Sequence, residues 1–199
     1  MTTSKLTSVR ICIIGSSGSG KDTLADILSK KLPNVHVLHF ADQLKVLCAK
    51  MLRYAIVEGN MPTDVTEEDL LGSEGSRAIL RTFWQWFGTE FVRNVVQKDY
   101  WIHEVEKSMR KLISVDPHVS IVIPDCRFEN EHEWARKNNF VMVGVFGMWR
   151  QPSGLPGHSS ELTTLDLEKD LMFTNTGTIQ DMEIWVDTVL IPHCRKALS

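Results

Sequence analysis

An apolar run that leads directly into a glycine-rich turn and a lysine constrains the fold of this chain more than any other feature. The run is Val9–Ile14, and Gly15–Lys21 follows with the spacing GxxxxGK. Glycines allow a tight turn whose backbone N–H groups bind phosphate, and the lysine reaches the β and γ phosphates. The amphipathic stretch after Lys21 predicts a helix whose positive N-terminal end adds to the attraction. The pattern therefore predicts a strand, a phosphate loop and a helix that bind a nucleoside triphosphate.

The residues expected to hold ATP in this loop are Gly15, Ser17, Gly18, Ser19, Gly20, Lys21, Asp22 and Thr23. The simple motif has Ser or Thr directly after the lysine as a magnesium ligand, whereas here Asp22 comes first and Thr23 second. Thr23 is the first candidate for binding Mg²⁺. Asp22 is expected either to act as a negative charge at the helix N-terminus or to contact the metal through water.

Apolar runs with the length of buried parallel strands recur along the chain and alternate with helical patterns. They are Val9–Ile14, Val35–Phe40, Val119–Pro124, Phe140–Phe146 and a shorter run at Leu171–Thr174. This alternation predicts an α/β fold with an open parallel sheet flanked by helices. Ligands of such sheets bind at the carboxyl ends of the strands. We therefore expect the phosphate loop, Asp42, Asp125 and Arg150 to line one edge.

Composition and charge restrict the kinds of partner and the compartment expected for this chain. A chain of 199 residues is expected to form a single domain, and a net charge of −3 gives no reason to expect binding to nucleic acid or acidic membranes. Four cysteines without a CxxC pair are expected to be reduced and buried, which indicates a cytoplasmic protein. No apolar run is long enough to predict a membrane span or a signal peptide.

The stretch between the second and third predicted strands, about residues 42–113, is longer than one crossover needs and is expected to bind the acceptor substrate. Its helical patterns cover Arg77–Phe87, Glu90–Val96 and Tyr100–Ile113, with a break expected at Gly88.

Arginine and aromatic side chains alternate in this stretch. Arginine forks bind a phosphate dianion and aromatic faces stack on bases, so Arg81 and Arg93 are candidates for the acceptor phosphate. Gln85 is a candidate for contact with base or sugar, and Trp101 for one wall of the site. For Trp84 and Trp86, core packing is the favoured interpretation.

Two carboxylates follow predicted strands. Asp125 is expected to orient magnesium beside Arg127, and the alternative is a cap for a helix at Glu129–Lys137. Asp42 is about equally well explained as a helix cap and as a substrate contact. Lys45 is either a solvated helix residue or a phosphate contact.

A segment rich in glycine and proline, about residues 147–161, follows the fourth predicted strand. Such segments often form lids that exclude water and bring an arginine to the transferred phosphoryl group. Arg150 is the candidate for that arginine. His158 has no neighbouring residue that indicates metal binding or general-base chemistry, and is expected to position substrate.

Taken in order, several strings resemble those of bacteriophage deoxynucleoside monophosphate kinases, within the P-loop nucleoside monophosphate kinase family. They are GKDT at Gly20–Thr23, FADxLK at Phe40–Lys45, RxxxQxxGTExxR at Arg81–Arg93, DxRFENE at Asp125–Glu131, HxSE at His158–Glu161 and NxG at Asn175–Gly177. The resemblance implies a P-loop kinase domain over residues 1–199, with a helical substrate-binding insertion and a lid. It also implies transfer of the γ-phosphate of ATP to a deoxynucleoside monophosphate.

The resemblance further implies roles for single residues. Lys21, Arg127, Arg150 and magnesium would neutralise the transferred group, with Asp125, Asp22 and Thr23 as candidate metal contacts. The acceptor site would include Asp42, Lys45, Glu131 and His158. Asn175 and Gly177 would contact adenine, although an ordinary left-handed glycine turn explains this string equally well.

Other functions fit parts of the sequence. Another small-molecule kinase of the same fold, specific for phosphomevalonate or dephospho-coenzyme A, is the nearest alternative. A GTP-dependent switch is disfavoured because the DxxG string at Asp69–Gly72 lies in a polar insertion and no NKxD string occurs. A binding module without catalysis would be expected to lose Lys21 or the arginines of the lid. The sequence leaves open whether two copies form a homodimer.

Overall fold

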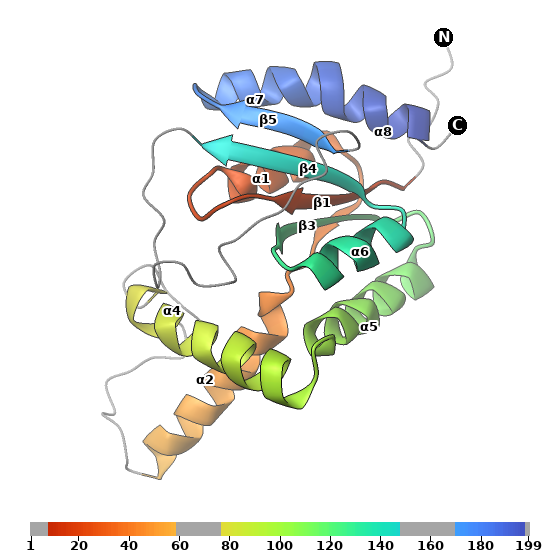
Figure 1. Ribbon diagram of the computed structural model, residues 1–199. Helices are drawn as coiled ribbons and strands as arrows, with labels where there is room; N and C mark the ends of the chain where they lie inside the picture. The colour runs from red at the N-terminus through yellow and green to blue at the C-terminus, as the bar shows by residue number, and fades with distance from the viewer. Residues whose placement is uncertain (1–7, 59–76, 148–169, 198–199) are drawn as a thin grey trace.

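The protein folds around a five-stranded parallel sheet, as predicted (Figure 1). The computed structural model describes residues 8–58, 77–147 and 170–197. The strand order is β2-β3-β1-β4-β5, so the strand before the phosphate loop is central. The strands are β1 (Arg10–Ile14), β2 (Val35–Val37), β3 (Ser120–Cys126), β4 (Val141–Gly147) and β5 (Leu171–Asn175).

Strand β2 is shorter than the predicted Val35–Phe40. Leu38 still donates its N–H to Val122 of β3, but the N–H of Phe40 donates to the carboxylate of Asp125. A side chain therefore replaces the neighbouring strand as hydrogen-bond partner, and the chain turns into α2 (Ala41–Val57).

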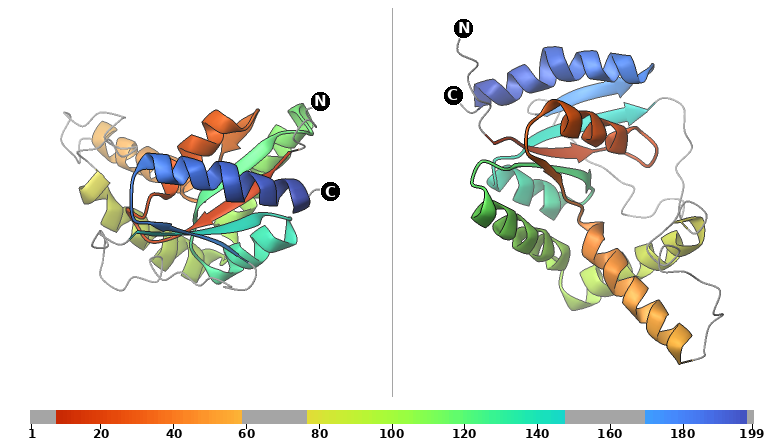
Figure 2. Two further views of the ribbon diagram at one scale, coloured as in Figure 1. Left: turned by 90° about the horizontal axis from the view of Figure 1, so that it is seen from above. Right: turned by 180° about the vertical axis from the view of Figure 1, so that it is seen from behind.

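Helices cover both faces of the sheet (Figure 2). On one face lie α1 (Lys21–Lys31) and a C-terminal helix made of α7 (Ile179–Trp185), η3 (Val186–Leu190) and α8 (Ile191–Ala197). On the other face lie α2, α5 (Tyr100–Val115) and α6 (Glu129–Lys137). Alternate side chains of β1 enter the two cores, with Ile11 and Ile13 in one and Cys12 and Ile14 in the other. The uninterrupted apolar run of this strand follows from burial on both faces.

The predicted helix break at Gly88 is wrong. Helix α4 (Arg77–Gln85) continues into the π-helical segment η1 (Trp86–Val96), which contains Gly88. A Cβ at Gly88 would lie 2.6 Å from a methyl group of Leu44 in α2. The glycine therefore permits close helix packing rather than a turn, and its carbonyl accepts a hydrogen bond from the Trp101 indole at 2.9 Å.

The structure also tests the predictions made for the cysteines and for two tryptophans. The four cysteines are buried with free thiols, as expected. Core packing is correct for Trp84, which packs against the core, but wrong for Trp86, which is 51% exposed on η1. No helix in the described part of the chain has the length and apolarity needed to cross a membrane.

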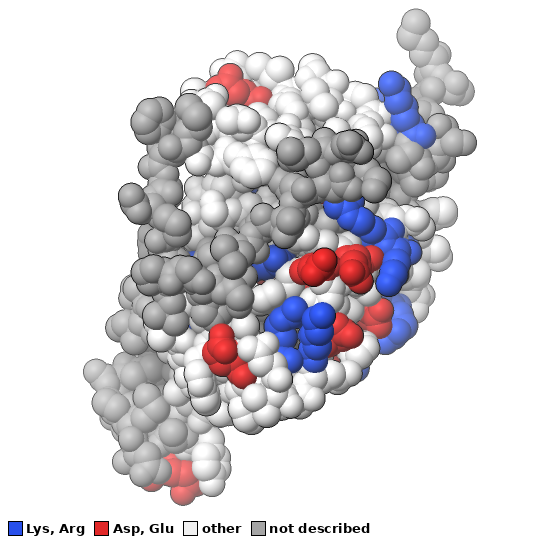
Figure 3. All heavy atoms as spheres, in the orientation of Figure 1, with Lys and Arg blue, Asp and Glu red and all other residues white. Residues whose placement is uncertain are grey.

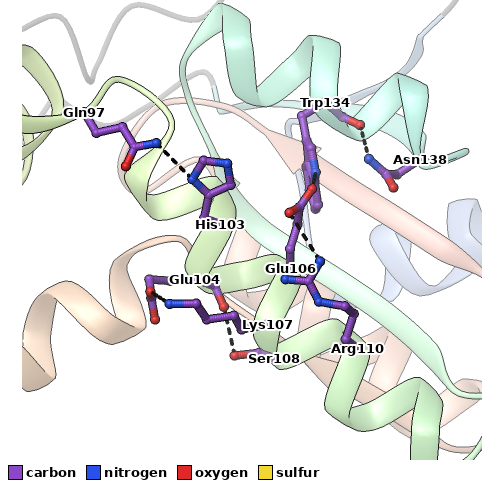
Figure 4. Close-up of polar contacts among 9 residues, drawn as sticks. All are labelled: Gln97, His103, Glu104, Glu106, Lys107, Ser108, Arg110, Trp134 and Asn138. Atoms are coloured by element: carbon purple, nitrogen blue, oxygen red, sulfur yellow. Dashed lines mark hydrogen bonds and ion pairs between the residues drawn. The ribbon is translucent and has the colours of Figure 1, made fainter.

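A buried indole ties α6 to α5 (Figure 4). The Nε1 of Trp134 donates to the Glu106 carboxylate at 2.8 Å, and Arg110 lies 3.7 Å from the same carboxylate. Asn138 donates to the carbonyl of Trp134 at 2.8 Å. Helix α5 therefore anchors α6, and with it the segment that leads from Arg127 into α6.

We expect Glu106→Ala to lower the free energy of unfolding by about 1–3 kcal/mol, because the buried Trp134 N–H loses its acceptor. Urea denaturation measures the change. Glu133→Ala, which removes an exposed carboxylate of α6, is the control and should stay within about 0.5 kcal/mol of the native protein. If Glu106→Ala costs as much in a Trp134→Phe background as in the native protein, the bond is not the cause.

Candidate active site

The phosphate loop adopts the backbone conformation that its glycines permit. Gly18 and Gly20 have φ of 76° and 106°, values that residues with a Cβ rarely adopt. Gly20 immediately precedes α1, and Lys21 opens it. The Lys21 side chain is buried and its Nζ donates to the carbonyl of Ser16 at 2.6 Å. The lysine therefore lies folded over the loop, beside the N–H groups that begin the helix.

The ends of β4 and β5 support the loop from the side. Asn175 donates its side-chain N–H to the carbonyl of Ser19 at 2.9 Å. A Cβ on Gly20 would lie 2.7 Å from this Asn175 amide, and one on Gly147 would lie 3.1 Å from the Cα of Ser19. Asn175 thus holds the loop backbone, and this long-range contact cannot be predicted from a local sequence pattern.

The NxG string does not form a left-handed glycine turn, because Gly177 is absent from the described residues with positive φ. A Cβ at Gly177 would clash with the Asp181 carboxylate. That carboxylate accepts the Thr178 N–H at 2.8 Å, and the Thr178 hydroxyl accepts the Asp181 N–H at 3.3 Å. Gly177 leaves room for this cap of α7.

Asp125 lies near the end of β3 and caps a helix, but not the expected one. Its two oxygens accept the N–H groups of Phe40 and Ala41 at 2.9 and 3.0 Å, so it caps α2. The N–H groups before α6 are bound instead by Glu131, as described below. Asp125 therefore joins the β3 end to the start of the predicted acceptor insertion.

Asp42 is engaged with His39 at the start of α2. Its carboxylate accepts the His39 N–H at 3.0 Å and lies 3.3 Å from the imidazole Nδ1. Burial lowers the pKa of His39, but the hydrogen bond to Asp42 and the charge of Asp125 outweigh burial and raise the pKa overall. The His39–Asp42 pair therefore lies at the first turn of α2, next to the cap that Asp125 provides.

Glu131 supports the loop that follows β3. It is buried, and one carboxylate oxygen accepts the N–H groups of Arg127 and Phe128 at 2.8 and 3.0 Å. One of its two carboxylate oxygens is therefore used by the adjacent backbone, and the predicted substrate contact stays a prediction. Burial raises the pKa of Glu131 to about 7, against the effect of the two N–H donors.

Arg93 packs against the same loop. Its guanidinium lies 3.8 Å from the centre of the Phe128 ring and donates to the carbonyl of Lys98 at 3.2 Å. Burial lowers its pKa, and the charges of Glu131 and Asp99 oppose this effect. The pairing of Arg93 with Phe128 has no signal in the sequence, because the two residues come from separate elements.

Arg81 connects the insertion to the phosphate loop. It projects from α4, and its Nη1 donates to the Ser17 hydroxyl at 3.3 Å. Gln85 follows one turn later and is buried, and Lys45 of α2 lies 5.5 Å from the centre of the Trp84 ring. Trp101, expected as a wall of the site, is 6% exposed and is used for core packing and for its bond to Gly88.

The other candidates are placed as follows. Thr23 is half-buried and Asp22 exposed in the first turn of α1, where Asp22 adds negative charge at the helix N-terminus. Arg150 and His158 lie outside the described residues.

Comparison with known proteins decides the family. The sequence profile of the deoxynucleotide monophosphate kinase family matches residues 63–186, which is more than half of the chain. The chain belongs to this family. A predicted deoxynucleotide monophosphate kinase of Acanthamoeba polyphaga mimivirus is 26% identical over 186 residues, covering 87% of this chain and 91% of the viral protein.

A solved sugar kinase from Janibacter has the same overall fold. It aligns with a TM-score of 0.50 and 11% identity over 92% of this chain and 95% of its own. The match to the family profile confirms the resemblance to deoxynucleoside monophosphate kinases that was predicted from the sequence. The chain is an ATP-dependent kinase that transfers a phosphoryl group to a deoxynucleoside monophosphate.

The buried Glu131 gives the stability of this kinase a pH dependence. Its folded-state pKa of about 7 exceeds the ordinary value of 4.5, so its contribution is complete below pH 4.5 and is lost as the pH rises through 7. We expect the free energy of unfolding to fall by roughly 2–3 kcal/mol between pH 5 and pH 8 from this group. Glu131→Gln, which keeps an acceptor oxygen, should flatten this slope in urea titrations.

Glu129→Gln, at an exposed position in the same helix turn, is the matched control and should keep the native slope. A native slope in Glu131→Gln would show that another group titrates.

Proposed function

We propose that Arg81 and the phosphate loop together form the place where donor and acceptor phosphates meet. The observation that carries this proposal is the hydrogen bond from Arg81 to the hydroxyl of Ser17. It brings an arginine of the acceptor insertion to the loop expected to hold the triphosphate. A planar guanidinium binds two phosphate oxygens at once, so Arg81 is suited to lie between the two substrates.

On the donor side, the loop N–H groups and Lys21 bind the β and γ phosphates of ATP. Ser19 supports this assignment, since its buried hydroxyl has no hydrogen-bond partner among the described residues. Buried hydroxyls are rarely left unpaired, and a phosphate oxygen would supply the acceptor. Gly15, Ser17, Gly18 and Gly20 shape the loop, and Asn175 and Gly177 are proposed to contact the adenine.

On the acceptor side, Arg81 and Lys45 bind the monophosphate, Gln85 contacts the base, and Arg127 neutralises the transferred group. Asp42 and Glu131 position the α2 start and the Arg127 loop. Arg93 is the weaker phosphate candidate because its guanidinium is already stacked on Phe128. Arg150 and His158 keep the expected roles in a lid at about residues 147–161.

Magnesium fits the oxygen donors at this edge of the sheet. Among the residues that the structure describes, no three His, Cys, Asp or Glu side chains gather as a metal cage. Mg²⁺ in phosphoryl-transfer sites is typically bound by substrate phosphates, water and one or two side-chain oxygens. Thr23 and Asp125 would supply those oxygens, with Asp22 acting through water, and the ion would neutralise charge on the phosphates.

The remaining chemistry is positioning. The acceptor phosphate is already anionic, so transfer needs no strong general base. Lys21, Arg81 and Arg127 hold the two substrates in line and neutralise the charge that moves between them.

The setting is proposed to be the cytoplasm of a virus-infected cell, with a bacteriophage source as the specific prediction. The free cysteines support a reducing compartment. On the face formed by α5 and α6, basic and acidic side chains are interspersed, which gives no support for nucleic-acid binding there (Figure 3). Trp86, Phe91 and Val95 are exposed on η1 and support a homodimer, which sedimentation would detect.

The function is tested by ADP release with ATP, Mg²⁺ and each deoxynucleoside monophosphate, with phosphomevalonate and dephospho-coenzyme A as comparison acceptors. We expect turnover with deoxynucleotides that disappears when EDTA removes the metal. Lys21→Ala should lower kcat by about 10³-fold, because the charge on the β and γ phosphates is lost. Lys30→Ala, at an exposed position of the same helix, is the control. A Lys21→Ala enzyme within tenfold of native would overturn the donor-site assignment.

Arg81→Ala should lower kcat/KM for the acceptor by about 10²-fold or more, because a bidentate phosphate contact is lost. Arg93→Ala should mainly lower the melting temperature, since its guanidinium packs on Phe128. Steady-state kinetics and thermal melts of both variants separate these roles. The reverse pattern would assign the acceptor phosphate to Arg93.

A further inference from the structure

His39 lies between the end of β2 and the start of α2, at the edge of the sheet where the strands end. Its backbone N–H donates to one oxygen of the Asp42 carboxylate at 3.0 Å. Its ring nitrogen Nδ1 lies 3.3 Å from the other oxygen of the same carboxylate. Asp42 therefore holds both the backbone and the ring of His39 in one orientation.

The second ring nitrogen of His39 is open to a ligand. Because a carboxylate only accepts hydrogen bonds, Nδ1 carries the hydrogen that faces Asp42, and Nε2 lies at the opposite edge of the ring. Among the residues that the structure describes, none forms a hydrogen bond with Nε2, and 34% of the side chain is exposed. An imidazole held by a carboxylate at one nitrogen can act on a substrate through the other.

The charges around the ring favour the form in which Nε2 is a donor. Burial lowers the pKa of His39, the hydrogen bond to Asp42 and the charges of Asp125 and Asp42 raise it, and Lys45 opposes them. The pKa is raised overall, and a protonated imidazole donates from both nitrogens. His39 thus offers a charged donor close to Lys45, which is proposed above to bind the acceptor monophosphate.

We propose that His39 is a further residue of the acceptor site, which donates from Nε2 to the phosphate of the deoxynucleoside monophosphate while Asp42 positions its ring. This inference rests on the proposed function, in which Arg81 and Lys45 bind that phosphate. A carboxylate repels a phosphate dianion and a protonated imidazole attracts it, so His39 is better suited than Asp42 to touch this group. Asp42 is then a positioning residue.

Two amide side chains separate the roles of the two ring nitrogens. The amide nitrogen of asparagine lies close to the position of Nδ1, and that of glutamine close to the position of Nε2. His39→Asn keeps a donor for Asp42 but loses the one offered to phosphate. It should lower kcat/KM for the deoxynucleoside monophosphate by about tenfold or more, without changing KM for ATP. His39→Gln should recover most of this loss.

His36→Asn, at an exposed position of β2, is the matched control and should leave the kinetics unchanged. A role of His39 limited to holding the start of α2 predicts the opposite order of the two His39 variants. His39→Asn would then match the native enzyme, while His39→Gln would lose activity and melting temperature together. That order would overturn the inference.

Calorimetric titration without ATP locates the contact on the ligand. Each deoxynucleoside monophosphate and the matching deoxynucleoside, which lacks the phosphate, are titrated into the native enzyme and His39→Asn. We expect the variant to bind the monophosphate about tenfold more weakly and the nucleoside equally well. An equal loss for both ligands would overturn the contact with phosphate.

Arg81→Ala in the same titration separates this inference from the proposed function. Weaker monophosphate binding in Arg81→Ala but not in His39→Asn would overturn the inference alone. Weaker binding in His39→Asn but not in Arg81→Ala would uphold the inference and overturn the assignment of Arg81. Native binding in both variants would overturn both.

Discussion

A phosphate loop must leave most of its N–H groups available to the ligand, so it can use few of them to stabilise itself. Here the Ser19 N–H donates to the Ser16 carbonyl at 3.3 Å. In this structure, residues of two other strands support the backbone of the loop. Ser19 accepts a hydrogen bond from Asn175 of β5 at its carbonyl, and Gly147 of β4 approaches the Ser19 backbone so closely that a Cβ there would be tightly packed. The strands that follow β1 in the sheet thus hold the loop in a shape that the loop sequence alone could not maintain.

Side chains that bind backbone N–H groups also connect the start of the acceptor insertion with the Arg127 loop. Asp125 ends the strand beside β1 and binds the first N–H groups of α2, while Glu131 binds the N–H groups that lead into α6. One carboxylate near the β3 end and one in the first turn of α6 therefore hold the first residues of the acceptor insertion and the Arg127 loop against one sheet edge. Movement of α2 relative to β3 would have to break charge-assisted hydrogen bonds.

The sheet and the phosphate loop could be predicted from the sequence because each depends on a local pattern. The apolar runs and the GxxxxGK spacing report burial on both faces and a tight turn without reference to distant residues. The partners of Asp125, Glu131 and Arg93 could not be predicted, because each contact joins elements whose relative placement depends on the whole fold. Gly88 shows a different limit, since a glycine that breaks a helix and one that lets two helices touch look identical in a sequence.

The strand order has a consequence for how the chain is made. β1 lies between β3 and β4, so its partners are residues 121–126 and 141–144. During synthesis the apolar strand that leads into the phosphate loop emerges early. It has no neighbouring strand to pair with until most of the chain has been translated. Contacts of such long sequence separation fold slowly and expose apolar strands to aggregation. The feature that gives this kinase its nucleotide site is therefore also the one that the nascent chain is slowest to protect.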